Sequence, residues 1–439
     1  MNNNYNLYIA FGTLPALFSQ INIFLDKDPS YVWVRSAGNF SKKEYLINNL
    51  KYYYKFDCSD LDYINNEYKD IEEQVKNILL NDKKARFTVF TDDVRCHYFL
   101  KPLILAGAYD RVDKMILLSD GNITLDNYLK YNSHNDNILK EKWDNIIDNI
   151  KNNINIDNYL NEYYFGFWLS IRKDVEYLTP CPEVISNSEN KFNIKLFDIK
   201  KRYKRLNSKQ KDLFFGDHLL NNKIKNILNN KKNILIITGT YNFGSPEITN
   251  FIYKDLINQV LIDYRNDYKI LFKPHPIFAH ELNDEFNNFL VDRDIEIMPV
   301  KMPLELILWE RDDIYIGGFC STSFVLINKK NVKFLFGEPI GFSRFIFKNI
   351  KTYNIQVSQD MAILFKESFG KNEAIINGIN NRIDIMTNNL KSELDKIINI
   401  TESNLYKDNN INLREAIKIM IKLLKIKFVS TIKTIGAKK

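Results

Sequence analysis

The stretch Lys269–Ser323 holds two short apolar runs, each of which continues into a loop of chemically distinctive residues. The first run, Lys-Ile-Leu-Phe at 269–272, leads into Lys-Pro-His-Pro at 273–276. The second run, Asp-Ile-Tyr-Ile at 313–316, ends in Gly-Gly-Phe-Cys-Ser-Thr-Ser at 317–323. We interpret both runs as buried strands and both loops as the beginnings of helices. Ligands bind at the carboxyl edge of open α/β sheets, so the two loops should lie side by side at a nucleotide site.

The rest of the chain repeats this alternation of strand and helix. An apolar run begins at Asn233 and ends in Gly239-Thr240, and Ser245-Pro246-Glu247 has the pattern of a helix start. The first half opens with the apolar run 5–11, which breaks at Gly12-Thr13. Further strands are expected at 31–34, 52–56, 87–90, 115–118, 296–300 and 332–336, and helices at 14–25, 65–80, 96–106, 248–260, 283–290 and 304–309. Residues 124–180 are expected to be mostly helical, and 177–185 to close the first half. The alternation predicts an α/β fold with doubly wound, largely parallel sheets.

The polar stretch 186–231, rich in Lys and Asn, predicts a connection between two Rossmann-like domains. A chain of 439 residues is long enough for each domain to bury a core of its own. We expect an N-terminal domain at 1–190, a C-terminal domain at 191–405 and a separate tail at 406–439. The active site is expected in the cleft between the two domains.

Composition narrows the class of protein. The chain is 45% apolar and 13% aromatic, which is typical of a globular protein. Its four cysteines form no CxxC pair, which argues against a disulfide scaffold or structural zinc and for a reducing compartment. The N-terminus lacks the pattern of a signal peptide, and no run of 18 apolar residues predicts a membrane span.

The net charge of +7 belongs to the end of the chain. Residues 411–439 carry eight Lys and Arg against Glu415 alone, which is 8 − 1 = +7, so the first 410 residues are neutral. A broad basic face for nucleic acid is therefore not expected. Apolar and basic residues of the tail fall on different faces of a helix, which suits the anionic inner surface of a membrane. The alternative is a terminal helix packed on the body with its lysines in solvent.

Several residues of the second half could carry chemistry at the predicted sheet edge. His275 lies between two prolines that fix its backbone, and a donor there could neutralise phosphate charge. Ser321, Thr322 and Ser323 offer hydroxyls and amides at a helix start, which favours an anion, although plain N-capping explains them as well. Glu305, in the first turn of a helix, either holds the hydroxyls of a ribose or complements the helix dipole.

The first half supplies a candidate base. Asp120 ends the strand at 115–118 and precedes Gly121, where a carboxylate could accept a proton from a hydroxyl; an Asp-Gly turn is the alternative. Gly12 and Thr13 are expected at the same cleft. The pairs Asp92-Asp93 and Asp312-Asp313 lack a third ligand at short spacing, so we interpret them as structural, with Asp92-Asp93 capping a helix, and expect no metal site.

In combination these motifs resemble those of the bacterial sialyltransferases with a GT-B fold, glycosyltransferase families 52, 80 and 38. The motifs are Ser119-Asp120-Gly121, Lys273-Pro274-His275-Pro276, Pro303-Leu304-Glu305 and Gly317 to Thr322, with a similar loop at Ile237 to Thr240. The resemblance covers 230–340 well and 1–125 loosely. Ser119 departs from the family pattern, which has an acid there, but the acid directly before the glycine is kept.

The resemblance implies a metal-independent transferase that uses CMP-sialic acid and inverts the anomeric configuration. Asp120 would be the base, and His275 with Ser321 and Thr322 would stabilise the leaving phosphate. Glu305 would hold the ribose, while Lys273 and the Gly239-Thr240 loop would line the cytidine pocket; Pro276 and Ser323 complete the expected donor site. No cofactor is expected.

The expected acceptor is a hydroxyl of a surface glycan, such as lipopolysaccharide, lipooligosaccharide or a capsule, and is lipid-linked. The expected location is the bacterial cytoplasm, peripheral on the inner face of the cytoplasmic membrane through 411–439. Alternatives are a transferase for another CMP-activated nonulosonic acid or Kdo, a UDP-sugar transferase, and a non-catalytic protein that binds glycans or nucleotides.

Overall fold

The computed structural model describes most of the first 354 residues. The ranges that it describes are 3–35, 47, 49–56, 61–92, 97–119, 136–152, 174–185, 193–215, 225–227, 229, 233–239, 246–275, 282–300, 302–339 and 343–354. Three predicted site residues, Asp120, Thr240 and Pro276, lie outside these ranges, as does the whole tail at 406–439.

The first sheet has seven parallel strands in the order β3-β2-β1-β4-β5-β6-β7. Their bounds are β1 Asn4–Ala10, β2 Ser30–Arg35, β3 Leu50–Phe56, β4 Arg86–Asp92, β5 Val112–Leu118, β6 Val175–Thr179 and β7 Asn193–Leu196. The order reverses between β1 and β4, which is the switch point where a doubly wound sheet opens at its carboxyl edge. The apolar alternation therefore predicted the type of sheet correctly.

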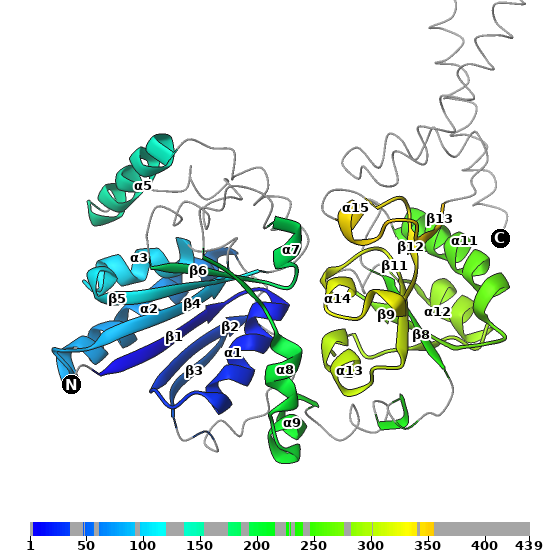
Figure 1. Cartoon of the computed structure of the whole chain (residues 1–439), viewed down its shortest axis with the longest axis horizontal. Helices are drawn as coiled ribbons and strands as arrows, with labels where there is room; N and C mark the ends of the chain where they lie inside the picture. The colour runs from blue at the N-terminus through cyan, green and yellow to red at the C-terminus, as the bar shows by residue number, and fades with distance from the viewer. Residues whose placement is uncertain are drawn as a thin grey trace, which may run out of the picture. The chain divides into compact units, whose positions relative to one another are not determined.

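Helices cover both faces of this sheet, as parallel sheets require. Figure 1 shows the sheet and the helices that follow its strands, which are α1 Thr13–Leu25, α2 Leu61–Asn81, α3 His97–Leu105, α5 Asp136–Lys151 and α7 Pro182–Ile185. The Gln20 amide of α1 donates to the Tyr53 hydroxyl at 2.9 Å, whereas Asp70 of α2 accepts from Tyr52 at 2.7 Å. Neighbouring residues of one strand point to opposite faces, so α1 and α2 lie on opposite sides.

The second sheet has six parallel strands in the order β10-β9-β8-β11-β12-β13. Their bounds are β8 Ile234–Gly239, β9 Lys269–Pro274, β10 Glu296–Ile297, β11 Ile314–Gly318, β12 Val332–Phe336 and β13 Lys351–Tyr353. Every residue of β8 is buried, which is why this strand reads as one continuous apolar run. The order reverses between β8 and β11, so the loops after these strands flank the switch point.

The helices of the second half are α11 Pro246–Tyr264, α12 Asp284–Val291, α13 Leu304–Glu310, α14 Thr322–Val325 and α15 Ser343–Ile346. Figure 1 shows α11 and α12 on one side of the second sheet and α13 and α14 on the other. An aromatic cluster holds the first pair in place: the Phe272 ring of β9 lies 5.6 Å from Tyr253 of α11 and 5.4 Å from Phe286 of α12. Each aromatic pair adds roughly 0.5–1.5 kcal/mol to the burial of its area.

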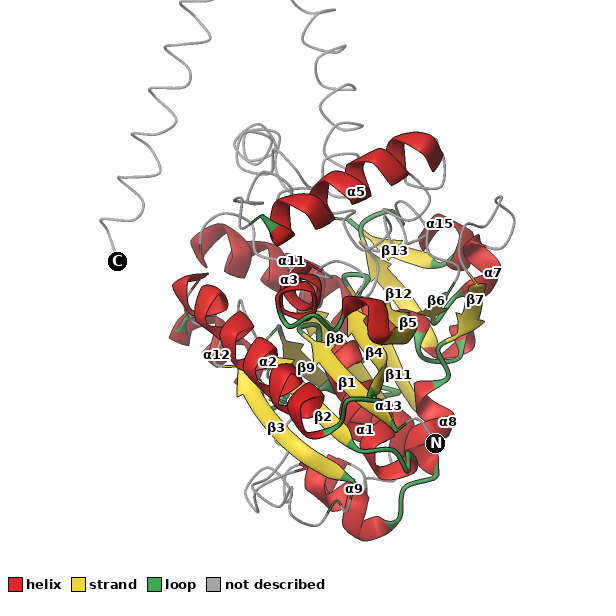
Figure 2. Cartoon of the chain, turned by 90° about the vertical axis from the view of Figure 1, so that its left-hand side faces the viewer, coloured by secondary structure: helices red, strands yellow, loops and turns green. Residues whose placement is uncertain are grey.

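In the stretch 186–231, predicted to be a polar connection, the described residues include a strand, two helices and the helical residues 225–227 and 229. The strand is β7, which pairs with β6, and the helices are α8 Ile199–Lys204 and α9 Ser208–Phe215. Residues 177–185, expected to close the first half, hold the end of β6 and the helix α7, which begins at Pro182. Figure 2 draws β7 as a strand and α8 and α9 as helices. No helix in the described ranges combines the length and apolarity needed to cross a membrane.

Candidate functional site

The carboxyl ends of β8 and β11 are fastened together by one buried hydroxyl. Thr238 Oγ1 lies 3.3 Å from the carbonyl oxygen of Gly317 and 3.1 Å from that of Phe319, and it donates its proton to this pair. Thr238 was not among the residues predicted for the site. It lies in the loop Ile237 to Thr240 that resembles the family, but a threonine near the end of an apolar strand gives no sign of this bond, because threonine is common in strands.

Gly318 turns the chain sharply at the end of β11. Its φ is +122°, a conformation that L side chains rarely adopt, and a Cβ there would lie 2.6 Å from the Thr238 carbonyl oxygen. Only glycine fits this close approach of two backbones. The turn directs the following residues, Ser321 to Ser323, into the short helix α14 beside the switch point.

Glu305 and Ser323 meet at the start of two different helices. Glu305 is the second residue of α13 and is 8% exposed, and Ser323 is the second residue of α14 and is 6% exposed. The Ser323 hydroxyl donates to Glu305 Oε1 at 2.7 Å. A buried carboxylate is costly unless it is hydrogen-bonded, so this bond stabilises the charged group in place.

Lys273 brings a buried positive charge to the same region. Its side chain is nearly inaccessible, and Nζ donates to the carbonyl oxygens of Val300 at 2.8 Å and Pro274 at 3.0 Å. Burial lowers the pKa of Lys273 to about 8, and the nearby Glu305 carboxylate acts in the opposite direction. The bond to Val300 ties the end of β9 to the loop that leads into α13.

His275 follows β9 directly and is half-buried. Burial and the positive charge of Lys273 lower the pKa of His275 below its ordinary value. The imidazole is therefore mostly neutral near pH 7, with one nitrogen that donates and one that accepts. An anion bound beside it would raise its pKa and draw a proton onto the ring.

Ser321 and Thr322 precede Ser323 and are both half-buried. Ser321 occupies the N-cap position of α14, but its side chain makes no capping hydrogen bond. Its backbone carbonyl accepts from the Phe324 amide at 3.0 Å instead. N-capping therefore does not account for the Ser321 hydroxyl. Gly239 closes β8 at the same edge, and a Cβ there would lie 2.6 Å from the Phe272 ring.

The first sheet places its candidates at its own carboxyl edge. The Gly12 amide donates to Asp92 Oδ2 at 2.8 Å and the Phe11 amide donates to the same oxygen at 2.6 Å, while Thr13 is exposed at the start of α1. Asp92 was predicted to cap a helix with Asp93; it instead ends β4 and fixes the loop after β1. Ser119 is buried directly after β5, next to the residue predicted as the base.

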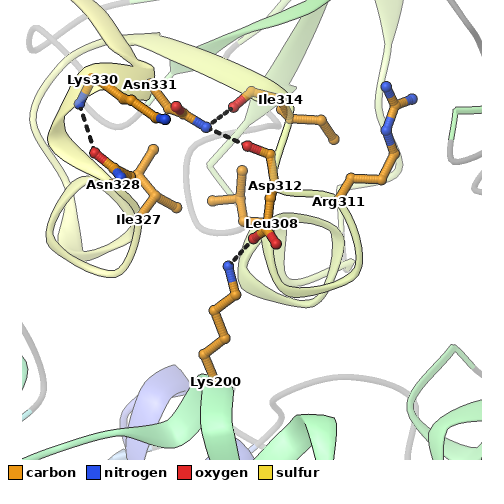
Figure 3. A pocket seen from close by; sticks show the side chains of 9 residues that line it. All are labelled: Lys200, Leu308, Arg311, Asp312, Ile314, Ile327, Asn328, Lys330 and Asn331. Atoms are coloured by element: carbon orange, nitrogen blue, oxygen red, sulfur yellow. Dashed lines mark hydrogen bonds and ion pairs between the residues drawn. The ribbon is translucent and has the colours of Figure 1, made fainter.

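A pocket lies at the opposite, amino end of the second sheet (Figure 3). Its volume is about 230 Å³, and Ile314, the first residue of β11, is among its lining residues. It contains none of the predicted site residues. Two of its cations have partners, since Lys200 of α8 pairs with Asp312 and Arg311 Nε lies 2.8 Å from Asp313. The carboxyl edge, with its buried charges, is therefore the better candidate.

The structure thus brings together four of the predicted donor-site residues, Lys273, His275, Glu305 and Ser323, by contact or by electrostatic influence. Among the described residues, no group of three or more His, Cys, Asp or Glu side chains is arranged to hold a metal ion. Two Rossmann-like sheets, one with a charged site at its switch point, are the layout of a GT-B glycosyltransferase.

Comparison with solved structures supports that class. A sialyltransferase from the luminous marine bacterium Photobacterium phosphoreum, described as α/β-galactoside α-2,3-specific, has a TM-score of 0.59 at 14% identity and covers 80% of this chain and 99% of its own. The GT-B domain of a Photobacterium damselae sialyltransferase has a TM-score of 0.55 at 16% identity, with coverages of 77% and 92%. At such identities the likeness establishes the fold. No curated protein sequence matches the chain.

The family of the chain is shown by a match of its sequence. The family described as alpha-2,8-polysialyltransferase matches residues 47–332, which is more than half of the chain. The chain belongs to this family and is a sialyltransferase of the bacterial GT-B type. The predicted class of enzyme and the predicted fold are both confirmed.

Proposed function

We propose that this sialyltransferase moves sialic acid from CMP-sialic acid to a hydroxyl group of a surface glycan, with inversion at the anomeric carbon and without a metal ion. The observation that carries the proposal is the pair of buried charges, Lys273 and Glu305, beside His275 at the carboxyl edge of the second sheet. A nucleotide donor needs a hydrogen-bond partner for its ribose hydroxyls and a group that stabilises the negative charge of its phosphate.

In the proposed reaction the bond between the anomeric carbon and the phosphate oxygen of CMP breaks. The hydroxyl of the acceptor forms the new bond from the opposite face, and its proton passes to Asp120. Negative charge grows on the leaving phosphate, where His275 and the hydroxyls of Ser321 and Thr322 would stabilise it. A mostly neutral imidazole suits this role, because its one N–H can donate a hydrogen bond to the phosphate oxygen on which the charge develops.

Glu305 is proposed to accept hydrogen bonds from the ribose, since a carboxylate is an acceptor with two oxygens. Lys273 and the loop at Gly239-Thr240 are proposed to border the cytidine. The Lys273 ammonium donates to two backbone carbonyls, so its contribution there is to hold the backbone and to supply charge at short range.

The acceptor is proposed to be a glycan of lipopolysaccharide, lipooligosaccharide or capsule. The family description, alpha-2,8-polysialyltransferase, makes a terminal sialic acid on such a glycan a further acceptor to test. The basic residues of 411–439 would keep the enzyme at the inner face of the cytoplasmic membrane. A related CMP-activated nonulosonic acid or Kdo is the competing donor.

The experiment is hydrolysis of CMP-sialic acid by the purified chain with EDTA present. We expect release of CMP that EDTA does not suppress and that His275→Ala reduces by about two to four orders of magnitude, the usual contribution of one acid–base group. Asp120→Ala should abolish transfer to an acceptor while CMP still binds. Absence of both CMP release and CMP binding would refute the donor, and a preference for CMP-Kdo would replace it.

A further inference from the structure

Ser323 is the buried member of the three hydroxyl residues at 321–323, and its hydroxyl is bonded to Glu305. Its Oγ donates to Glu305 Oε1 at 2.7 Å, and both side chains are more than nine-tenths buried. A hydroxyl has a single proton to donate. While the Ser323 hydroxyl donates its hydrogen bond to Glu305, it cannot donate one to a phosphate oxygen.

The structure assigns Ser323 a positioning role: it fixes the carboxylate of Glu305 so that this group can recognise the ribose of a nucleotide donor. The inference rests on the proposed use of a cytidine nucleotide by this site. It replaces the expectation that Ser323 belongs with Ser321 and Thr322 at the phosphate. Ser321 and Thr322 remain the proposed phosphate ligands.

Two contacts limit the position of Glu305, one on the backbone before its helix and one on its side chain. Lys273 fastens the loop at Val300, three residues before the N-cap Pro303, and so limits where α13 can begin. Ser323 then fixes the side chain of Glu305 from the neighbouring helix. The part of the chain that the structure describes supplies no second hydrogen bond to Glu305, so Oε2 keeps its lone pairs for a ligand.

This arrangement has a consequence for nucleotide selectivity. A glutamate side chain has several rotatable bonds, and ordering it at the moment of binding costs conformational entropy. A glutamate that is already fixed has lost that freedom in the free enzyme, so a ribose hydroxyl gains more from meeting it. The discrimination between ribose and deoxyribose should therefore depend on Ser323 as well as on Glu305.

The test uses the full chain and measures dissociation constants by calorimetry for CMP, its 2′-deoxy and 3′-deoxy analogues, and cytidine. The affinity ratio of CMP to the deoxy analogues reports the ribose contribution, and the ratio of CMP to cytidine reports the phosphate contribution. We expect Ser323→Ala to reduce the ribose ratio for at least one analogue by about tenfold, in line with one charge-assisted hydrogen bond. The phosphate ratio should change by less than about twofold.

Companion variants separate positioning from a general loss of packing. Ser323→Thr keeps a hydroxyl, so its ribose ratio should match that of the wild type. Glu305→Gln should reduce the ribose ratio, and the double variant Glu305→Gln with Ser323→Ala should have the same ratio as Glu305→Gln alone, because both changes remove the same contact. Thr322→Val should lower the phosphate ratio instead. Ser30→Ala removes a buried hydroxyl at the start of β2, whose Oγ donates to the backbone carbonyl of Asp28. It controls for the loss of one buried hydroxyl away from the site.

Each result decides the matter. If Ser323→Ala lowers the phosphate ratio and spares the ribose ratio, Ser323 is a phosphate ligand and the inference is wrong. Equal losses of both ratios would also overturn it, because they indicate a structural role only. A wild-type chain that binds CMP and its deoxy analogues equally would refute the inference but keep the donor, whereas no CMP binding at all would refute the proposed function as well. If Ser323→Ala does not fold, Glu305→Gln and Ser323→Thr still give the ribose ratio.

Discussion

Replacing Lys273 with Met should change how the stability of the protein depends on pH. Lys273 is 6% exposed, and burial lowers the pKa of its ammonium to about 8. The lysine of an unfolded chain has a pKa of about 10.4, so the folded protein holds this proton less tightly by about 3 kcal/mol. That amount is the net cost of keeping the charge buried near pH 7, with the bonds to Val300 and Pro274 in place.

The direction follows from which state binds more protons. Between about pH 8 and about pH 10.4 the unfolded chain carries the proton and the folded chain increasingly does not, so the free energy of unfolding rises with pH. Below pH 8 both states are protonated, and the full cost of burial is present. Lys273→Met has no such group. The free energy of unfolding of the wild type minus that of the variant should therefore rise by about 2 kcal/mol from about pH 7 to about pH 9.5.

The assay is urea unfolding at several pH values, followed by tryptophan fluorescence, for which the buried Trp309 of α13 is a suitable reporter. Lys269→Met provides the matched control on the same strand, because Lys269 pairs with Glu296 at 2.8 Å near the surface. A difference between wild type and Lys273→Met that stays flat over the whole range would refute the reasoning. It would mean that the ammonium is hydrated in the folded protein.

The sequence predicted the sheets well wherever strands were apolar. β12 was predicted at 332–336 and β9 was predicted to begin at Lys269, and both bounds are confirmed. β7 was missed because its four residues are half-exposed or exposed, so it has no apolar run. It is an edge strand, and it is stabilised by pairing with β6, which no local pattern reveals.

The donor site was predictable in position but not in its internal contacts. Strand ends located Lys273 and His275, and a helix start located Glu305, because parallel strands bring such positions to one edge. The bond between Ser323 and Glu305 joins residues 18 apart in sequence and depends on how two helices begin, so periodicity gives no sign of it. Asp92 shows the same limit, since its partners are amides about 80 residues earlier in the chain.

Three further predictions concern the strand ends and the histidine. Gly318→Ala should lower the free energy of unfolding by about 3 kcal/mol or more, because its φ of +122° and the contact with Thr238 leave no room for a Cβ; thermal unfolding measures this, and a shift of less than about 1 kcal/mol would contradict the geometry. Asp92→Asn should cost about 1–2 kcal/mol in the same assay, because an amide oxygen is a weaker acceptor for two backbone amides, and an unchanged midpoint would show that this loop is held by other contacts. CMP binding should take up protons near the ordinary histidine pKa of about 6.5, because the pKa of His275 is lowered in the free protein and an anionic phosphate would raise it. The affinity for CMP should then increase as pH falls from the pKa of His275 in the CMP-bound protein to its pKa in the free protein. Calorimetry in buffers of different ionisation enthalpy measures the proton uptake. His275→Gln should abolish the uptake, and if it persists in this variant, the proton goes to another group and His275 does not face the phosphate.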